Sequence, residues 1–314
     1  MATIFLTGAT GYIGGSVSVK LMEAGYTVRG LVRNRESAAR VAELGIDPVL
    51  GTLDDSELLT AEARRSDGAI NTASADHAGS VRALIAGLKD SGKPFLHTSG
   101  SSVIGDDARG NRSSDVVFDE DTPLVVNPLK QARRDIDLMV LEAATSGVRS
   151  VVICPSNIYG TGKGLNPNSV QIPFLVSNAR EQGSVQIVGA GLNIWSNVHI
   201  DDVADLYLLA LTKAPAGSFY FAENGEASFG LIGASIAKRL GQTTVESLPP
   251  EEAARRWGES KAYFSLGSNS RVRAVRARRE LGWNPQHSSV LAWIASEMPA
   301  AKTPSDPVAP PPTE

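Results

Sequence analysis

The stretch Thr7–Gly15, TGATGYIGG, places glycines at positions 8, 11 and 14, directly after a strand-like run and at the start of a helical pattern. In this setting Gly8 permits a tight turn, Gly11 lets the backbone approach a pyrophosphate, and Gly14 lets the helix pack closely on the strand. Backbone amides at the helix start then bind the phosphates. The alternative is that the glycines serve only the turn and its packing. Their position after the first strand favours a dinucleotide site built by Thr7 and the three glycines.

The end of the second expected strand selects between the two pyridine dinucleotides. An acidic residue there would bind the ribose 2′-hydroxyl of NAD, whereas this chain has GLVRNRE, with Arg33 and Arg35. A guanidinium matches a phosphate with two parallel hydrogen bonds. The pattern therefore predicts NADP(H) in preference to NAD(H). The alternative is that both arginines are solvated loop residues.

Short aliphatic runs alternate with helical patterns through the first half of the chain. The expected strands are 3–8, 26–33, 47–53, 68–73, 93–100 and 149–156. The expected helices are 11–25, 36–45, 56–66, 80–92 and 129–147. Such alternation is typical of βαβ units with short crossovers. It predicts an α/β fold with a doubly wound parallel sheet of the Rossmann type, which positions the glycine turn at a strand end.

The pattern loosens after Pro155 into glycine-rich loops, short strands and separate helices, which predict a small C-terminal substrate-binding lobe. We expect one domain over residues 1–298. Residues 1–160 would form mainly the dinucleotide-binding core and 161–298 mainly the lobe, with 198–214 returning to the core. The proline-rich residues 299–314 are expected to form a disordered tail.

Composition excludes several classes of protein. The 314 residues include 42% apolar and 20% charged residues, enough for a large core. The net charge of −4 gives no general attraction to nucleic acid. The only cysteine, Cys154, lies in an apolar run and is expected to be a buried structural thiol. No secretory leader, membrane span or metal site is predicted, so a cytoplasmic protein acting on a small molecule is the expectation.

Further motifs agree in order and spacing with one family. TGATGYIGG resembles the glycine fingerprint of the short-chain dehydrogenase/reductase superfamily, in its extended branch of epimerases, dehydratases and reductases. The other matching segments are NTAS at 71–74, TSGSSVIGD at 98–106, PSNIYGTG at 155–162, VHIDDVAD at 198–205 and RRELGWNP at 278–285. The resemblance covers about residues 1–296.

This resemblance implies a set of cofactor contacts. They are Gly8, Gly11, Tyr12, Ile13, Arg33, Leu53, Ala73 and the loop Pro155–Ile158, which includes Asn157. One position departs from the family pattern, since Thr52 stands where many relatives have an aspartate that binds the adenine amino group. A threonine hydroxyl can still accept a hydrogen bond there.

The usual catalytic residues of the family are missing. Its chemistry normally uses a serine that positions the carbonyl, a tyrosine that transfers the proton, and a lysine four residues later that lowers the pKa of the tyrosine. Counting along the family helix, the tyrosine position falls on Leu129 and the lysine position on Arg133. The serine position falls on Gly100. Arg133 could still bind the ribose, but a guanidinium with a pKa above about 12 cannot act as a base.

Several residues are candidate substitutes. Ser99 and Ser101 flank Gly100 and could bind a carbonyl, although both could equally be structural hydroxyls. Tyr159 carries a suitable phenol, but relatives have a structural tyrosine there. Lys130 is expected to be solvated, because one residue turns the side chain about 100° around a helix.

Two hypotheses of function remain open. The first is an NADP-dependent oxidoreductase that transfers hydride to a small organic carbonyl or imine with an atypical proton donor. The second is a cofactor-bound protein without net redox turnover, either an isomerase or cyclase or a sensor of NADP(H).

Arg271, in a run of arginines expected to be mainly a solvated helix face, is a minor candidate for binding a diphosphate. A homodimer through the helix that includes 129–146 is possible, although its cationic edge argues against it.

Overall fold

The computed structural model describes residues 2–299, and the predicted tail lies outside them apart from Pro299. Seven parallel strands form the main sheet in the order β10-β6-β5-β4-β1-β2-β3. Their bounds are β1 (Thr3–Thr7), β2 (Thr27–Val32), β3 (Asp47–Leu50), β4 (Gly68–Asn71), β5 (Pro94–Thr98), β6 (Arg149–Pro155) and β10 (Ser218–Ala222). The order reverses between β1 and β4, which is the crevice where doubly wound sheets bind ligands. The predicted fold class is confirmed.

The edge strand β10 was not expected in this sheet. Six strands were predicted there, and the structure adds Ser218–Ala222, which pairs with β6 from Ser218 beside Val151 to Ala222 beside Pro155. All five of its residues are buried. A short buried run after a loop does not reveal its partner, so the sequence alone did not assign β10 to the core.

Eleven α-helices are present in the described residues. Their bounds are α1 (Tyr12–Glu23), α2 (Arg35–Glu43), α3 (Ser56–Arg65), α4 (Ala78–Leu88), α5 (Gln131–Glu142), α6 (Gln171–Gln182), α7 (Ile200–Lys213), α8 (Phe229–Arg239), α9 (Pro250–Trp257), α10 (Val275–Leu281) and α11 (Val290–Ser296). Of the long helix predicted over 129–147, only α5 (Gln131–Glu142) is α-helical. A 3₁₀ turn, Pro128–Lys130, precedes α5, and a second, Ala143–Ser146, follows it.

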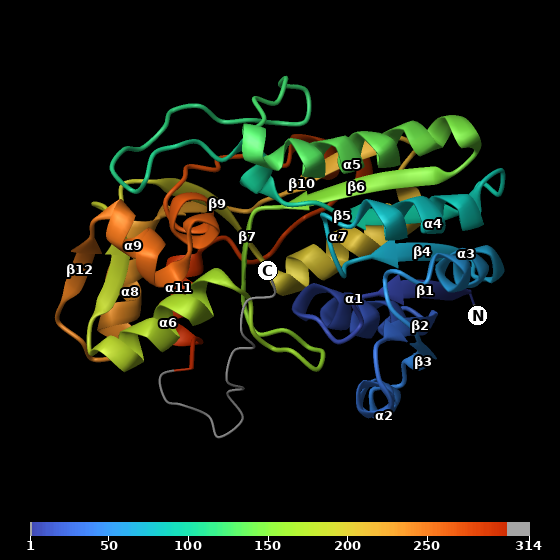
Figure 1. Ribbon diagram of the computed structural model, residues 1–314, viewed down its shortest axis with the longest axis horizontal. Coiled ribbons are helices and arrows are strands. Elements are labelled where there is room, and N and C mark those ends of the chain that lie inside the picture. The colour runs from blue at the N-terminus through green and yellow to red at the C-terminus, as the bar shows by residue number, and fades with distance from the viewer. Residues whose placement is uncertain (1, 300–314) are drawn as a thin grey trace.

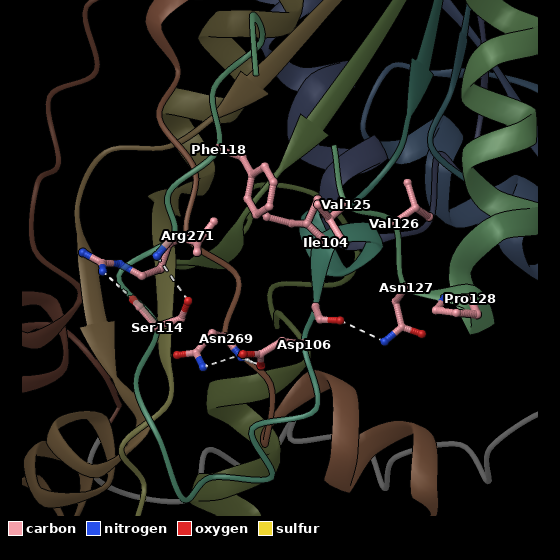
Figure 2. A pocket seen from close by; sticks show the side chains of 12 residues that line it. Ile104, Asp106, Ser114, Phe118, Val125, Val126, Asn127, Pro128, Asn269 and Arg271 are labelled. Carbon is pink, nitrogen blue, oxygen red and sulfur yellow. Dashed lines mark hydrogen bonds between the residues drawn. The ribbon is translucent and has the colours of Figure 1, made fainter. Parts of the chain in front are cut away.

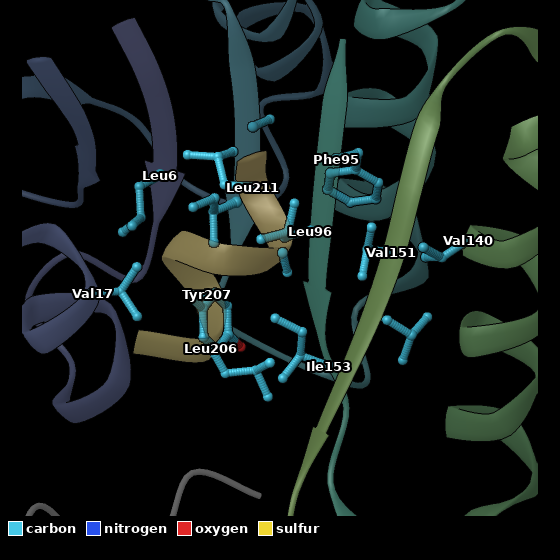
Figure 3. Close-up of a cluster of buried hydrophobic side chains, with 14 of the residues drawn as sticks. Leu6, Val17, Phe95, Leu96, Val140, Val151, Ile153, Leu206, Tyr207 and Leu211 are labelled. Atoms are coloured by element: carbon cyan, nitrogen blue, oxygen red, sulfur yellow. The ribbon is translucent and has the colours of Figure 1, made fainter. Parts of the chain in front are cut away.

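Helices cover both faces of the sheet. Helix α7 returns to the core and packs on α1, while α4 packs on both α3 and α5. Adjacent strand residues point to opposite faces. Figure 3 shows this at β5, where Phe95 lies toward Val140 of α5, and Leu96 lies toward Leu211 of α7.

The C-terminal lobe lies beyond one end of the sheet (Figure 1). It contains a three-stranded sheet, β11-β9-β7, and a two-stranded sheet, β12-β8. Their bounds are β7 (Asn157–Tyr159), β8 (Val185–Val188), β9 (Ile194–His199), β11 (Glu226–Ser228) and β12 (Val245–Leu248). A second buried apolar cluster, which includes Ile172, Trp195 and Phe229, holds the lobe together. Within residues 2–299, no helix combines the length and apolar character needed to cross a membrane.

Candidate active site

The glycine turn joins the ends of β1 and β4. Gly8 has φ +85°, and a Cβ on it would lie 2.8 Å from the amide nitrogen of Ala73. A Cβ on Gly14 would lie 2.2 Å from the carbonyl oxygen of Gly8. Both contacts are too short for any residue except glycine, so the turn depends on these two positions.

The N-terminus of α1 is arranged to receive an anion. Its N-cap, Gly11, makes no side-chain capping bond, so no side chain competes for the amides of the first turn, which includes Tyr12 and Ile13. The hydroxyl of Tyr12 donates to the carbonyl oxygen of Gly160 at 2.9 Å, which ties this turn to the loop after β7. Burial raises the pKa of Tyr12, so its phenol stays neutral. These residues fit a dinucleotide pyrophosphate.

The other expected cofactor residues divide into exposed and buried ones. Ala73 is exposed beside Gly8, and Leu53 is half-buried. Thr7 is fully buried, and its Oγ1 donates to Oδ1 of Asn71 at 2.6 Å, so its side chain supports the turn from beneath. In the expected loop after β6, Pro155, Asn157 and Ile158 are all buried.

Two arginines are exposed near the end of β2. Neither Arg33 nor Arg35 has a hydrogen-bond or ion-pair partner among residues 2–299, and Asn34 between them caps α2 by accepting from the amide of Ser37. Both guanidinium groups are therefore free to bind a phosphate. At Thr52, the hydroxyl donates to Oδ2 of Asp55 at 3.0 Å and accepts from the amide of Asp54 at 3.3 Å, which leaves one lone pair for an adenine amino group.

Arg133, at the start of α5, donates hydrogen bonds to Asp76 and Ser102, and we call this arrangement the arginine fork. Its Nε donates to Oδ1 of Asp76 at 2.8 Å, its Nη2 donates to Oδ2 of Asp76 at 2.5 Å, and its Nη1 donates to Oγ of Ser102 at 3.0 Å. The Arg133 side chain is only 17% exposed. A Cβ on Gly100 would lie 3.4 Å from Nη1 of Arg133. The guanidinium thus uses space beside Gly100, where the family resemblance places the usual serine.

Leu129 and Lys130 differ in their exposure to solvent. Leu129, at the usual tyrosine position, is 75% exposed. Lys130 is half-buried, with Nζ 5.5 Å from the ring centre of Phe264 in the C-terminal lobe. Burial and the charge of Arg133 lower the pKa of Lys130. The expectation of a solvated Lys130 was wrong, because a 3₁₀ turn replaces the assumed α-helix there and brings Lys130 toward the lobe.

The two candidate serines both have buried partners. Ser99 donates to Oδ2 of Asp137 at 2.9 Å, and Oγ of Ser101 lies 2.8 Å from Oγ of Ser270. Ser102, which was not a candidate, is the serine that contacts Arg133. Its position two residues after Gly100 was the available signal, but only the 3₁₀ turn Ser101–Ile104 determines which hydroxyl faces the arginine.

A buried polar cluster lies between β5 and α5. Asp137 is fully buried, and burial raises its pKa to about 6. Burial lowers the pKa of the neighbouring His97 to about 4, so this imidazole is neutral at pH 7. Nδ1 of His97 lies 3.0 Å from Nδ2 of Asn71, and its Nε2 lies 3.9 Å from Oδ1 of Asp137. Through its hydrogen bond to Asp137, the cluster fixes the side chain of Ser99 at the end of β5.

Tyr159 does not face the fork. Its side chain is fully buried, and its hydroxyl donates to the carbonyl oxygen of His287 at 3.0 Å. Burial raises its pKa well above the usual value. A phenol in this position holds the lobe together, and we leave Tyr159 out of the proposed catalytic residues.

Three possible metal ligands gather beside Tyr159. One ligand atom each from His199, Asp201 and His287 lies within 4.8 Å of the others. The two imidazole rings are stacked, with centres 3.8 Å apart and planes 20° apart, so their in-plane lone pairs cannot converge on one ion. The ammonium of Lys163 also lies 3.2 Å from Oδ1 of Asp201. The geometry therefore opposes a cation at this place.

A pocket of about 400 Å³ lies between the core and the lobe (Figure 2). Its walls come from three stretches that are far apart in the sequence, 104–106, 114–128 and 269–271. Ile104 follows Ser102 by two residues, and Pro128 begins the turn that leads to Lys130 and Arg133. These two short segments connect the pocket to the arginine fork, although neither Ser102 nor Arg133 lines it.

A doubly wound sheet with a glycine turn at its switch point defines a dinucleotide-binding protein of the Rossmann type. The model of the NAD dependent epimerase/dehydratase family matches residues 4–220. The chain belongs to this family, and the predicted membership of the extended short-chain dehydrogenase/reductase superfamily is confirmed. NAD(P) is the typical cofactor of the family.

Several relatives match along most of their length. An uncharacterised protein of Schizosaccharomyces pombe is 31% identical, over 94% of this chain and 98% of its own. Oxidase ucsJ of an Acremonium species is 34% identical, over 90% and 92%. A 4-hydroxy-2-methyl-3-oxo-4-farnesyl-3,4-dihydroquinoline-1-oxide ketoreductase of Stigmatella aurantiaca is 28% identical, over 89% and 91%.

Among solved structures, the dTDP-glucose 4,6-dehydratase DesIV of Streptomyces venezuelae has the same fold. It superposes with a TM-score of 0.74 over 93% of this chain and 94% of that one, at 23% sequence identity. This likeness concerns the fold alone.

Proposed function

We propose that this chain is an NADP-dependent oxidoreductase that transfers hydride to a small organic carbonyl or imine, with Arg133, Ser102 and Lys130 replacing the usual catalytic residues. The observation that carries the proposal is the arginine fork, a cation fixed at the family's catalytic position beside a pocket. The names of two relatives, an oxidase and a ketoreductase, support redox chemistry on an organic substrate.

The fork can bind the substrate oxygen. An arginine has five N–H donors, and Nε, Nη1 and Nη2 of Arg133 each use one on Asp76 or Ser102. The remaining donors can bind a carbonyl oxygen and stabilise the negative charge that develops on it. Ser102 accepts from Arg133, so its own hydroxyl proton is available to the same oxygen.

Lys130 can supply the proton. NADPH, when bound, supplies a hydride from its nicotinamide C4. Lys130 lies close enough to Arg133 and Asp76 for both of their charges to act on its pKa. An N–H bond of the Lys130 ammonium breaks as the O–H bond of the product alcohol forms, and the resulting amine regains a proton from solvent. The lowered pKa of Lys130 makes it a better acid than an ordinary lysine.

Oxidation of NADPH with a panel of aldehydes, ketones and imines tests the proposal. We expect turnover with at least one compound, and an Arg133→Met variant should lose about a hundredfold in kcat, the usual effect of removing an oxyanion donor. Arg82→Met, which changes an exposed arginine on α4, should keep full activity. Absence of oxidation throughout the panel would contradict the proposal. Turnover with unchanged cofactor absorbance would instead support the isomerase or cyclase alternative.

A further inference from the structure

Apolar side chains are unusually exposed around the pocket beside the arginine fork. Val116 and Val125, which line it, are 58% and 73% exposed, and Leu129, next to the lining residue Pro128, is 75% exposed. Ile104 and Phe118 form deeper parts of the wall. Clustered exposed apolar groups at a cavity mark a surface that an apolar partner covers.

The cation in the pocket wall, Arg271, is already paired with a carboxylate. Arg271 donates from Nε and Nη2 to the two carboxylate oxygens of Glu226 at 3.1 and 2.7 Å, and from Nη1 to the carbonyl oxygen of Ser114 at 2.6 Å. Arg273 donates to Glu226 as well. Arg271 therefore meets a ligand with three of its five N–H donors in use and with its charge paired to Glu226, which weakens its attraction for a diphosphate.

The other polar groups of the pocket also bind one another. Asp106 accepts from the backbone amide of Asn269 at 2.8 Å and from its Nδ2 at 3.0 Å. Asn127 donates to the carbonyl oxygen of Gly105 at 2.9 Å and accepts from the amide of Leu129 at 3.0 Å. Figure 2 shows the bonds between Asp106 and Asn269 and between Asn127 and Gly105 beside the apolar wall. A charged ligand group would lose hydration here without gaining a partner.

We infer that this pocket binds the body of an uncharged, largely apolar carbonyl compound, such as a bicyclic aromatic ketone, and rejects phosphorylated and carboxylated ones. The inference rests on the proposed function for the reduction itself. The apolar body would lie against Val116, Phe118 and Val125, and the carbonyl would point toward Ser102 and Arg133.

Calorimetric titration of the NADP⁺-saturated protein tests the pocket with a matched pair of ligands. Acetonaphthone is the neutral bicyclic ketone, and acetylnaphthoate is the same ketone with a carboxylate. We expect acetonaphthone to bind at least about tenfold more tightly than acetylnaphthoate, because an unpaired buried charge is costly, and UDP-glucose not to bind. Tight binding of UDP-glucose, or failure of acetonaphthone to bind, would overturn the inference.

Two variants test the assigned residues. Val125→Asp places a charge in the apolar wall and should weaken acetonaphthone binding about tenfold. Val170→Asp is the matched control, because Val170 is 68% exposed and does not line the pocket. Glu226→Gln removes the carboxylate that neutralises Arg271, and it should strengthen acetylnaphthoate binding about tenfold. Equal ketone binding by both aspartate variants, or no gain in Glu226→Gln, would contradict the assignment.

These binding measurements are independent of turnover. If acetonaphthone binds in the predicted pattern but no ketone oxidises NADPH, the pocket assignment stands and the proposed function fails. If NADPH is oxidised by a phosphorylated carbonyl compound and by no neutral one, the proposed function stands and the pocket assignment fails.

Discussion

The guanidinium Nη1 of Arg133 lies 3.4 Å from the position that a Cβ atom would take on Gly100. The family resemblance places a lysine at 133 and a serine at 100, so the two departures adjoin in space. A Cβ at 100 would touch the guanidinium at van der Waals distance, so the guanidinium lies directly beside the position of the usual serine. We therefore interpret them as one coordinated change of the site.

Asp76 should act as a positioning residue for this arginine. Asp76→Asn would remove the charge that binds Nε and Nη2, so the fork would lose its fixed orientation. We expect kcat to fall about tenfold while the KM for NADPH changes little, because geometry at the reacting centre is affected more than cofactor binding. Asp205→Asn, which breaks an ion pair with Lys20 on another surface, is the control. A loss confined to KM would argue against this role.

Lys130 should control the pH dependence of reduction. The reaction needs its ammonium form, so turnover should fall as pH rises through the lowered pKa of Lys130. Lys130→Met should lower activity about a hundredfold, and its remaining activity should no longer fall at high pH. Lys238→Met, at an exposed position of α8, is the matched control.

A second readout for Lys130 needs no turnover. Acylation by an amine-reactive ester, followed by mass spectrometry of the protein without cofactor, reports when each lysine becomes a neutral amine. The onset for Lys130 should come at lower pH than the onset for Lys238. Coincident onsets would mean that Lys130 has an ordinary pKa.

Arg33 and Arg35 should set the preference between the two dinucleotides. Replacing both with alanine would remove two free cations near the end of β2. We expect NADPH to bind about a hundredfold more weakly and NADH to bind nearly unchanged, since only NADPH carries the 2′-phosphate. Arg40→Ala, farther along α2, should leave both affinities unchanged. Equal weakening for both dinucleotides would show that the arginines do not read this phosphate.

Asp137 should make stability depend on pH. Its folded pKa of about 6 lies above the ordinary value of 3.8. The stability that its protonated form contributes is thus complete below about pH 4 and is lost as pH rises through about 6. Asp137→Asn stays neutral, so its free energy of unfolding relative to the parent should rise by roughly 3 kcal/mol between pH 4 and pH 8.

Urea unfolding at both pH values measures this change. Asp135→Asn, which alters an exposed carboxylate on the same helix, should show no such difference. A constant difference between Asp137→Asn and the parent at the two pH values would contradict the shifted pKa.

The sequence predicted the parts of the molecule that have local signals. The glycine turn is specified by Gly8 and Gly14, whose missing side chains are required by backbone contacts. The alternation of aliphatic runs and helical patterns identified six strands of the main sheet. The family spacing brought attention to Leu129, which lies in the 3₁₀ turn before α5, and to Arg133, which lies in the first turn of α5.

The sequence missed contacts between distant segments. Asp76 meets Arg133 across 57 residues, and no spacing rule links them. Ser102 was passed over because a 3₁₀ turn, not strand alternation, orients it. The arginine run was expected to be a solvated helix face, whereas α10 begins only at Val275 and Arg271 is bound to Glu226 from a different strand. Such pairings depend on tertiary packing.

Isotope transfer tests the central claim most directly. NADPH deuterated at nicotinamide C4 on the transferred face would be incubated with the protein and acetonaphthone, and the alcohol would be analysed by mass spectrometry. The proposed function predicts deuterium at the carbinol carbon, and Arg133→Met should form this product about a hundredfold more slowly. A product without deuterium, or no alcohol from any carbonyl compound of the panel and no amine from any of its imines, would contradict it.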